Sequence, residues 1–348
     1  MNRISANRIP SRIPSLDGLR AISILLVVAG HWAELRLHSS PAADVAGAFA
    51  NLGVRIFFVI SGYLITTLLL KEYAKTSTID LRDFYVRRAY RILPAAVAFM
   101  LVVFVVFWHE LRWYHMAAAA LYLANFDWTH PWFLGHLWSL SVEEQFYFLW
   151  PVVLKKWFRN RQAMLVGVIA FSPLYRVACH FLQLHGKADE TFPAVADVLA
   201  VGCLLAIFAK RLPFRLAVAR TGIACGLIVP VALVPVYVGL LRFRTTPLLL
   251  FVLWPLMHAS IAGLLLHVVQ RPYSILNARP VVWLGKISYS LYLWQQLFVF
   301  GTHSKPWYYV FFAVGLAGFS YYSVEQPMLR LREWRSVVRE RRRVLVAA

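Results

Sequence analysis

The chain has 348 residues, of which 60% are hydrophobic and only 15% are charged. A soluble domain averages roughly 45–50% apolar and about 25% charged residues, so this composition excludes an ordinary soluble fold. The formal net charge of +20 would suit a nucleic-acid-binding protein. However, most Lys and Arg residues lie between the hydrophobic runs, where the positive-inside rule of membrane proteins collects them. The composition therefore predicts an integral membrane protein that binds no nucleic acid.

Hydrophobic runs such as 92–107 lack the two-residue alternation of a β-barrel strand and predict transmembrane helices. A span needs about 20 residues. The sequence then predicts an all-α, polytopic transmembrane helix bundle of about ten spans, with both termini in the cytoplasm. The predicted spans are 16–35, 50–70, 91–109, 139–157, 163–184, 194–210, 218–240, 247–268, 281–302 and 308–328.

This topology depends on how two segments, 114–126 and the N-terminus, lie in the membrane. The apolar stretch 114–126 is short, and counting it as a span would place the basic segment 155–161 outside, so we expect a re-entrant or interfacial piece. The N-terminus resembles a signal peptide, but ionisable residues interrupt its apolar run, and we expect an uncleaved first helix. One membrane-embedded domain is predicted over 1–348, with 330–348 as a basic cytoplasmic tail.

Ionisable residues within spans are candidates for a functional site, because a charge at mid-bilayer costs at least about 2.5–3.5 kcal/mol. In the first helix Arg20 and His31 are eleven residues apart, which places both on one face about 16 Å apart. This pairs a cation that can hold phosphate with a histidine that can move a proton. The alternative is an interfacial anchor plus a histidine satisfied by a neighbouring helix.

Further arginines lie in and beside the next two spans. Arg88 and Arg91 are one helical turn apart at the start of the third span, and together they can clamp a phosphate. Positive-inside anchoring is the alternative. In the second span Arg55 is expected to pair with a carboxylate or a ligand anion, and Ser61 with Gly62 allows close helix approach.

The span that begins near 139 carries two carboxylates in its second turn. Glu143 and Glu144 point about 100° apart, so only one can face a given partner squarely. A buried glutamate can orient a histidine and raise its basicity. The dipole of the helix offers an alternative reason for acidic residues near its N-terminus. Asp197 and Glu325 are further candidates.

No segment carries the spacing of a metal site, a nucleophilic serine or a phosphate-binding glycine loop. The three cysteines lie apart in apolar runs and are expected to fill the core; they are Cys179, Cys203 and Cys225. No metal and no bound cofactor are therefore expected.

Six segments, taken in order, resemble the acyltransferase 3 family of bacterial integral membrane acyltransferases. They are SLDGLRAISILLVVAGHW (15–32), NLGVRIFFVISGYLIT (51–66), FYVRRAYRILP (84–94), HLWSLSVEEQFYFLWP (136–151), LGKISYSLYLW (284–294) and SYYSVEQP (320–327). The resemblance implies a multi-pass enzyme of the bacterial cytoplasmic membrane. Such enzymes move an acyl group, commonly acetyl from acetyl-CoA, to cell-surface glycans, lipid-linked saccharides or exported small molecules.

The resemblance also implies roles for individual residues. His31 matches the catalytic histidine and Arg20 its partner in the first-helix motif, and Glu143 matches the acidic position of the fourth span. Arg88 and Arg91 match the arginine pair associated with acyl-CoA, and Arg20 is expected to bind acyl-CoA with them. Supporting positions are Asp17, Arg55, Ser61, Glu144, Trp138, Asp197 and Glu325. Members often carry histidine where this chain has Gln295, which leaves open a proton-transfer role for the last helix pair. Some members append a soluble periplasmic hydrolase-like domain. This chain ends too early for one, so a single polypeptide is expected to complete the transfer.

The resulting hypothesis is a membrane O-acyltransferase with acyl-CoA as co-substrate. The arginines hold the donor's phosphates, and His31 acts as general base or carries the acyl group, with Glu143 orienting its imidazole. Aromatic residues of 126–138 form a sugar-binding mouth or, alternatively, an interfacial belt. The alternative function is a transporter or flippase that uses the buried charges as a relay.

Overall fold

The computed structural model describes residues 13–37, 40–184, 190–209, 247–299 and 306–347. Within these ranges every regular element is a helix, which confirms the predicted all-α class. The α-helices are α1 (Pro14–Arg36), α2 (Pro41–Thr76), α3 (Leu81–Phe107), α4 (Trp113–Ala120), α5 (Leu137–Lys156), α6 (Arg161–Phe181), α7 (Phe192–Phe208), α10 (Pro247–Gln270), α11 (Arg279–Lys286), α12 (Ser288–Val299), α13 (Tyr309–Ser320) and α14 (Gln326–Ala347). Short 3₁₀ turns are η1 (Ala124–Phe126), η2 (Trp132–Leu134) and η3 (Phe158–Asn160), and η5 (Tyr321–Glu325) is a π-helical turn.

Five helices of the described part are long and apolar enough to cross a bilayer: Pro14–Arg36, Pro41–Thr76, Leu81–Phe107, Phe158–Phe181 and Phe251–Gln270. A chain with several such helices is a multi-pass membrane protein. α7 is apolar but shorter, at 17 residues. The predicted span 218–240 lies outside the described residues.

Several helices extend beyond the spans predicted from hydrophobicity. α2 begins at Pro41, where the Ser40 side chain accepts a hydrogen bond from the Ala43 amide, and α3 begins at Leu81 behind an Asp80 cap. The connections predicted at 36–49 and 71–91 are therefore largely helical. The capping residues set these boundaries, and a hydrophobicity window does not detect them.

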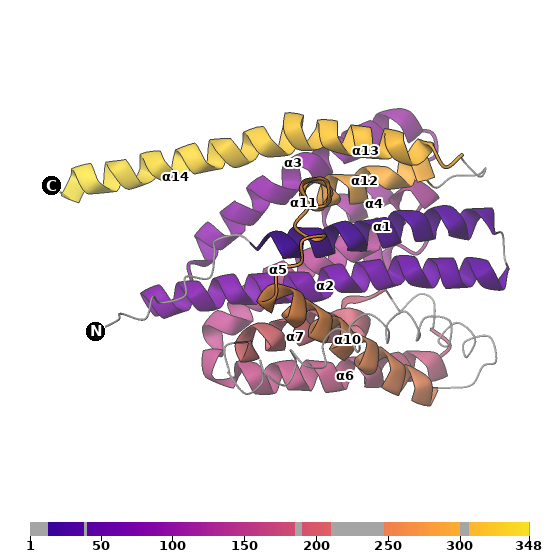
Figure 1. The fold of residues 1–348 in the computed structure, drawn as a ribbon, viewed down its shortest axis with the longest axis horizontal. Helices are drawn as coiled ribbons and strands as arrows, with labels where there is room; N and C mark the ends of the chain where they lie inside the picture. Colours follow the sequence, from indigo (N-terminus) through magenta and orange to yellow (C-terminus); the bar gives the residue numbers. More distant parts are fainter. Residues whose placement is uncertain (1–12, 38–39, 185–189, 210–246, 300–305, 348) are drawn as a thin grey trace.

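The last two predicted spans are not single helices. The span at 281–302 divides at Ile287 into α11 and α12. The span at 308–328 is α13, followed by the π-helical turn η5 and then by α14. The basic tail belongs to α14, and Figure 1 shows this helix reaching beyond the rest of the bundle.

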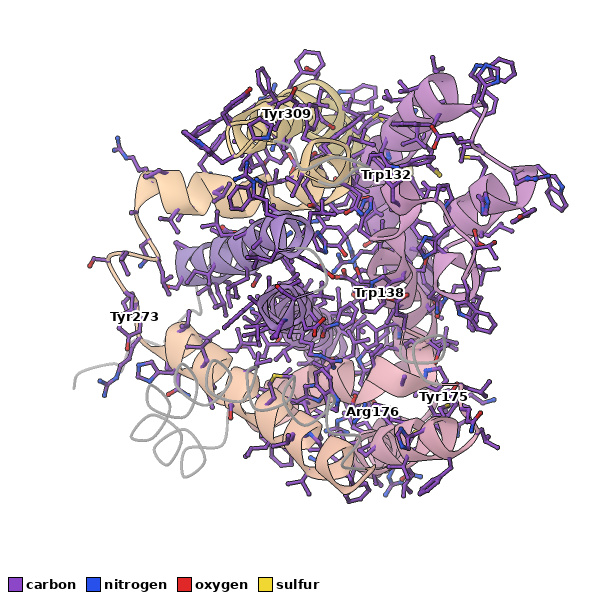
Figure 2. All side chains as sticks on the ribbon, turned by 90° about the vertical axis from the view of Figure 1, so that its right-hand side faces the viewer. Trp132, Trp138, Tyr175, Arg176, Tyr273 and Tyr309 are labelled. Carbon is purple, nitrogen blue, oxygen red and sulfur yellow. The ribbon has the colours of Figure 1, made fainter. Side chains whose placement is uncertain are left out.

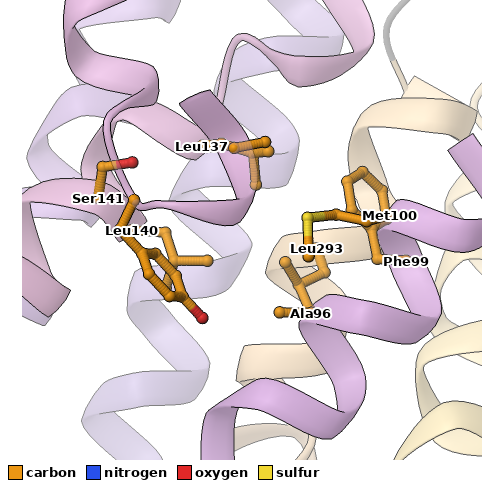
Figure 3. Close-up of a pocket in the computed structure, with 9 residues that line it drawn as sticks. Ala96, Phe99, Met100, Leu137, Leu140, Ser141 and Leu293 are labelled. Atoms are coloured by element: carbon orange, nitrogen blue, oxygen red, sulfur yellow. The ribbon is translucent and has the colours of Figure 1, made fainter. Parts of the chain in front are cut away.

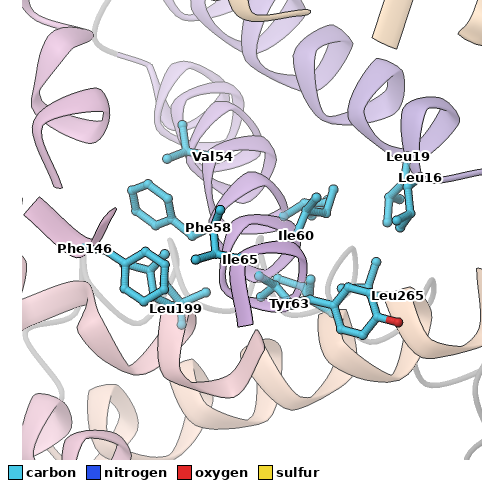
Figure 4. Close-up of a cluster of buried hydrophobic side chains, with 14 of the residues drawn as sticks. Leu16, Leu19, Val54, Phe58, Ile60, Tyr63, Ile65, Phe146, Leu199 and Leu265 are labelled. Carbon is cyan, nitrogen blue, oxygen red and sulfur yellow. The ribbon is translucent and has the colours of Figure 1, made fainter. Parts of the chain in front are cut away.

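The bundle is organised around α2, which packs against α1 and α7. Figure 1 shows α6, α7 and α10 on one side of the α1–α2 pair and α3 with α12–α14 on the other. α1 begins and α14 ends on the same side of the bundle. The central core joins these layers, as Figure 4 shows for Leu19 on α1, Phe58 and Ile65 on α2, and Leu199 on α7.

Two glycines permit backbones to cross without side chains between them. An added Cβ at Gly62 would lie 2.2 Å from the Leu199 carbonyl oxygen, so the predicted close helix approach is confirmed between α2 and α7. An added Cβ at Gly285 would lie 1.9 Å from the Asp17 carbonyl oxygen. The start of α1 is thereby held directly against α11.

The stretch 114–126 contains α4, whose eight residues are too few to span a membrane. His115 of α4 pairs with Asp127 at 2.6 Å, and Gln145 of α5 donates to Asn125 and to the Tyr122 carbonyl. These contacts fix the segment against α5. A small apolar void of about 10 Å³ lies beside it, lined by residues of α3, α4, α5 and α12 (Figure 3).

Candidate functional site

A cavity of about 570 Å³ lies between α1, α2, α3, α5, α12 and the α13–α14 junction. Residues of α2 from Val54 to Lys71 line it, and at 1.5 Å a residue these seventeen steps cover about 25 Å of helix. The cavity therefore runs along much of the bundle. Its ionisable lining residues are Asp17, Arg20, Lys71, Arg88, Arg91, Glu143, Glu144, Lys286 and Glu325.

Basic side chains line the end of the cavity that lies near the start of α3, here called the basic end. Its cations come from three helices and are Lys71, Arg88, Arg91 and Lys286. Arg88 lies over the Tyr147 ring at 4.3 Å, and Arg91 is exposed. The predicted pairing of the two arginines on one surface is confirmed, since both line the cavity. Arg20, further along α1, interacts electrostatically with Arg91.

Three carboxylates from α5 and the η5 turn line the same cavity as these cations. Glu143 accepts hydrogen bonds from Ser61 of α2 and from Tyr147, one turn further along α5. Both Glu143 and Glu144 line the cavity despite their different directions. Glu325, on the π-helical turn η5, accepts from Ser290 and interacts electrostatically with Arg91. π-Helical turns within α-helices are frequent at functional sites.

The opposite end of the cavity, here called the deep end, contains the first lining residue of α5, Ser139, and the last lining residue of α12, Tyr292. The hydroxyls of Ser139 and Tyr292 pair with each other there. Tyr292 also donates to the His136 carbonyl at 3.0 Å, and Ser139 lies 3.3 Å from the same carbonyl. This pair ties the first turn of α5 to α12.

His31 lies one helical turn beyond the deep end. Its Nδ1 is 3.2 Å from Oε1 of Gln295, three residues after Tyr292 on α12. Gln295 donates to Gln296, which donates to the Trp132 carbonyl. Because an amide oxygen only accepts hydrogen bonds, Nδ1 is the donor to Gln295, and the neutral imidazole then carries its lone pair on Nε2.

This arrangement differs from one sequence expectation. Glu143 was expected to orient the His31 imidazole, but it binds Ser61 and Tyr147, and Gln295 holds the imidazole instead. The reason is that Glu143 and His31 lie at different positions along the bundle axis. Glu143 faces the middle of the cavity, whereas His31 lies toward the far end of α1 beside α12.

Two other candidates belong to a separate buried network. Arg55 donates to Asn51 at 2.7 Å, contacts His258 at 3.0 Å and lies over the Trp254 ring. Asp197 pairs with Arg176 at 2.8 Å and with His258 at 3.4 Å. Arg176 lies on α6, and Figure 2 shows it beside Tyr175. None of these residues lines the cavity. His258 therefore bridges Arg55 and the Asp197 carboxylate. The network connects α2, α6, α7 and α10.

Trp138, the remaining candidate, packs edge-on against Phe58 with ring centroids 6.2 Å apart, and it lies toward the middle of the bundle in Figure 2. Sequence reasoning missed Lys71, Lys286, Ser139, Tyr147 and Tyr292, all of which line the cavity. Four of these stand within or directly beside the quoted motifs. The motif letters identified the segments, but only the packing shows which side chains face the cavity.

Comparisons with known proteins identify the family of the chain. The acyltransferase domain family matches residues 13–324, and the chain therefore belongs to this family of acyltransferases. The family expected from the six motifs is thereby confirmed.

Similar bacterial proteins are named as O-acetyltransferases or putative O-acetyltransferases. The chain is 31% identical over 324 residues to the peptidoglycan O-acetyltransferase OatA of Listeria monocytogenes, which covers 81% of this chain and 49% of that protein. It is 32% identical over 382 residues to the putative peptidoglycan O-acetyltransferase YrhL of Bacillus subtilis, covering 94% and 56%. It is 29% identical over 384 residues to the putative O-acetyltransferase SAR0937 of Staphylococcus aureus, covering 93% and 59%. The chain spans about half the length of these curated relatives. No solved structure matches the chain significantly.

Proposed function

We propose that the chain is a membrane O-acetyltransferase that moves an acetyl group from cytoplasmic acetyl-CoA to a hydroxyl of a cell-surface glycan. In this proposal it spans the bacterial cytoplasmic membrane about ten times with both termini inside, so that the basic end of the cavity opens to the cytoplasm. The names of two relatives make peptidoglycan the first acceptor to test.

One observation carries the proposal. A single cavity joins five basic side chains to a deep end that lies one helical turn from His31. Acyl-CoA has the matching form, since several phosphates stand at one end of a long flexible arm and a thioester at the other. Guanidinium groups bind phosphate oxygens in a bidentate fashion, which suits Arg88 and Arg91 to the phosphates. The pantetheine arm then extends past Arg20 toward Tyr292.

His31 performs the proton transfer in this scheme. Its Nε2 takes the proton of the acceptor hydroxyl, or attacks the thioester itself and carries the acetyl group, and Gln295 fixes the imidazole in either case. Glu143 acts on the donor side, because its hydrogen bonds to Ser61 and Tyr147 shape the middle of the cavity.

The transporter alternative gains no support from the comparisons, because the named relatives are O-acetyltransferases. A transport role would also not explain why the chain belongs to a family of acyltransferases. We therefore propose acyl transfer alone.

The test uses the purified chain in lipid vesicles with acetyl-labelled acetyl-CoA and either peptidoglycan fragments or a lipid-linked disaccharide. We expect alkali-labile O-acetyl esters on a sugar acceptor with the wild-type chain. His31→Ala is expected to abolish transfer. The matched control is His109→Ala, because His109 is exposed beyond the end of α3 and lines no part of the cavity.

Full transfer by the His31→Ala variant would refute the catalytic assignment. If the wild-type chain bound acetyl-CoA but neither transferred nor hydrolysed its acetyl group, the proposed function itself would fail.

A further inference from the structure

We propose that the Tyr292 hydroxyl is a catalytic group of this transfer, which donates a hydrogen bond to the carbonyl oxygen of the bound thioester. The inference rests on the proposed function and adds to it a group that stabilises the charge developing on that oxygen.

The first argument is position. Tyr292 is 8% exposed and Ser139 4%, yet both line the cavity, at the end opposite the basic side chains. Tyr292 and Gln295 are three residues apart on α12, so they lie on one face of that helix. One face of α12 therefore presents a hydroxyl to the cavity and, one turn further, an amide to His31. A carbonyl carbon between the cavity and His31 has Tyr292 as its neighbour.

The second argument is an account of hydrogen bonds. The hydroxyls of Ser139 and Tyr292 each lie within hydrogen-bond distance of the His136 carbonyl oxygen, and they also pair with each other. When Ser139 donates to the His136 carbonyl, that carbonyl stays paired without Tyr292. The Tyr292 proton can then turn to a ligand oxygen without leaving a buried carbonyl unsatisfied, which would otherwise be unfavourable.

The chemical step needs such a donor. The acceptor oxygen, or His31 in the two-step route, bonds to the thioester carbon, and the electron pair of the C=O bond moves to oxygen. When the carbonyl re-forms, the carbon–sulfur bond breaks, and in the direct route the leaving coenzyme thiolate takes up the proton that His31 removed from the acceptor. In the two-step route the thiolate takes up a proton of the acetyl-imidazolium. The acceptor oxygen then bonds to the acetyl carbon as the carbon–nitrogen bond breaks, and the acceptor's proton returns to the imidazole. Tyr292 keeps its own proton throughout and stabilises the intermediate oxyanion, as donors in oxyanion holes do.

A structural role for Tyr292 is the competing explanation, since the pair also links α5 to α12. Tyr85 provides the matched comparison. Its hydroxyl donates to the Phe148 carbonyl at 2.7 Å, which likewise links a tyrosine on one helix to the backbone of α5. Tyr85 does not line the cavity. Loss of its hydroxyl removes the same kind of bond without removing a group from the site.

The experiment compares Tyr292→Phe with Tyr85→Phe in lipid vesicles, with acetyl-CoA as donor. Rates are expressed per molecule of protein that still binds acetyl-CoA, so that a misfolded fraction does not count. We expect kcat to fall about 100-fold or more in Tyr292→Phe, while KM for acetyl-CoA changes less than twofold. Tyr85→Phe is expected to keep the wild-type kcat.

A second variant tests the hydrogen-bond account. Ser139→Ala leaves Tyr292 as the remaining hydroxyl partner of the His136 carbonyl, so kcat is expected to fall, but less than in Tyr292→Phe. The double variant is expected to be no slower than Tyr292→Phe alone, because the serine acts through the tyrosine.

A kcat for Tyr292→Phe within twofold of the wild-type value overturns the inference. A rise in KM at constant kcat also overturns it, because the hydroxyl would then bind the donor without acting on the reaction. Both results require an active wild-type chain, so they are distinct from failure of the proposed function.

Discussion

The prediction that tests the donor site most directly concerns Arg91 and Arg88. Each is replaced with glutamine, which keeps the length and polarity of the side chain but removes its charge. Arg87→Gln is the control, because Arg87 is next to Arg88 in sequence but pairs with Glu72 and Asp83 outside the cavity. All three changes remove the same charge from the same turn of α3.

The magnitude follows from the contacts. A hydrogen bond to a charged group contributes about 1.5–3 kcal/mol, which corresponds to a factor of about 10 to 150 in affinity. Arg91 is repelled by Arg88, and Arg20 by Arg91. Removing one cation relieves this repulsion in the free protein and offsets part of the loss. We therefore expect KM for acetyl-CoA to rise about tenfold for Arg91→Gln or Arg88→Gln, with little change in kcat.

The assay measures initial transfer rates with acetyl-CoA and with acetyl-pantetheine, which lacks the phosphates. The wild-type chain is expected to prefer acetyl-CoA strongly, and the two cavity variants to lose about a factor of ten of this preference. Arg87→Gln is expected to keep it. The reasoning is refuted if all three variants retain the wild-type preference, or if Arg87→Gln loses as much of it as the others.

Three further changes test other parts of the structure. Gln295→Leu removes the acceptor of the His31 imidazole hydrogen bond; a hydrogen bond of this kind contributes about 0.5–1.5 kcal/mol, so kcat should fall about 2- to 12-fold, and an unchanged kcat would contradict the assignment. Gly285→Ala should lower the melting temperature in detergent, whereas Gly167→Ala, at a position with open space around it, should not; equal effects would argue against the close crossing of α1 and α11. Asp197→Asn leaves the buried Arg176 guanidinium without its carboxylate and should lower the free energy of unfolding by about 3–5 kcal/mol at constant donor KM; an unchanged unfolding midpoint would show that the network contributes nothing to stability.

Much of the site could be predicted from the positions of ionisable residues in apolar runs. Because a charge in the bilayer is costly, Arg20, Arg88, Arg91 and Glu143 stood out from the sequence, and all four line one cavity. Gly62 could be predicted as a close-contact position for a similar reason, since small residues mark helix interfaces in membranes.

The partners of these residues could not be predicted, because they depend on how far each helix slides along its neighbours. Glu143 and His31 both belong in the bundle interior, but an axial offset decides whether they meet, and no periodicity encodes that offset. Tyr292 was missed for another reason. Tyrosines are common near membrane interfaces, so its type carries little information until its hydroxyl is seen at the end of the cavity.

The cavity has a consequence for how the protein is made. Its walls come from both ends of the chain, with Asp17 and Arg20 on α1 and with Lys286, Tyr292 and Glu325 some 270 residues later. Synthesis runs from the N-terminus, so the donor site does not exist until the last helices have inserted beside the first. A nascent or truncated chain carries the arginines without the wall that completes their binding site. Under the proposed function we therefore expect no transfer before the last helices have inserted, and two fragments divided before α11 would have to associate in the membrane to form the proposed donor site.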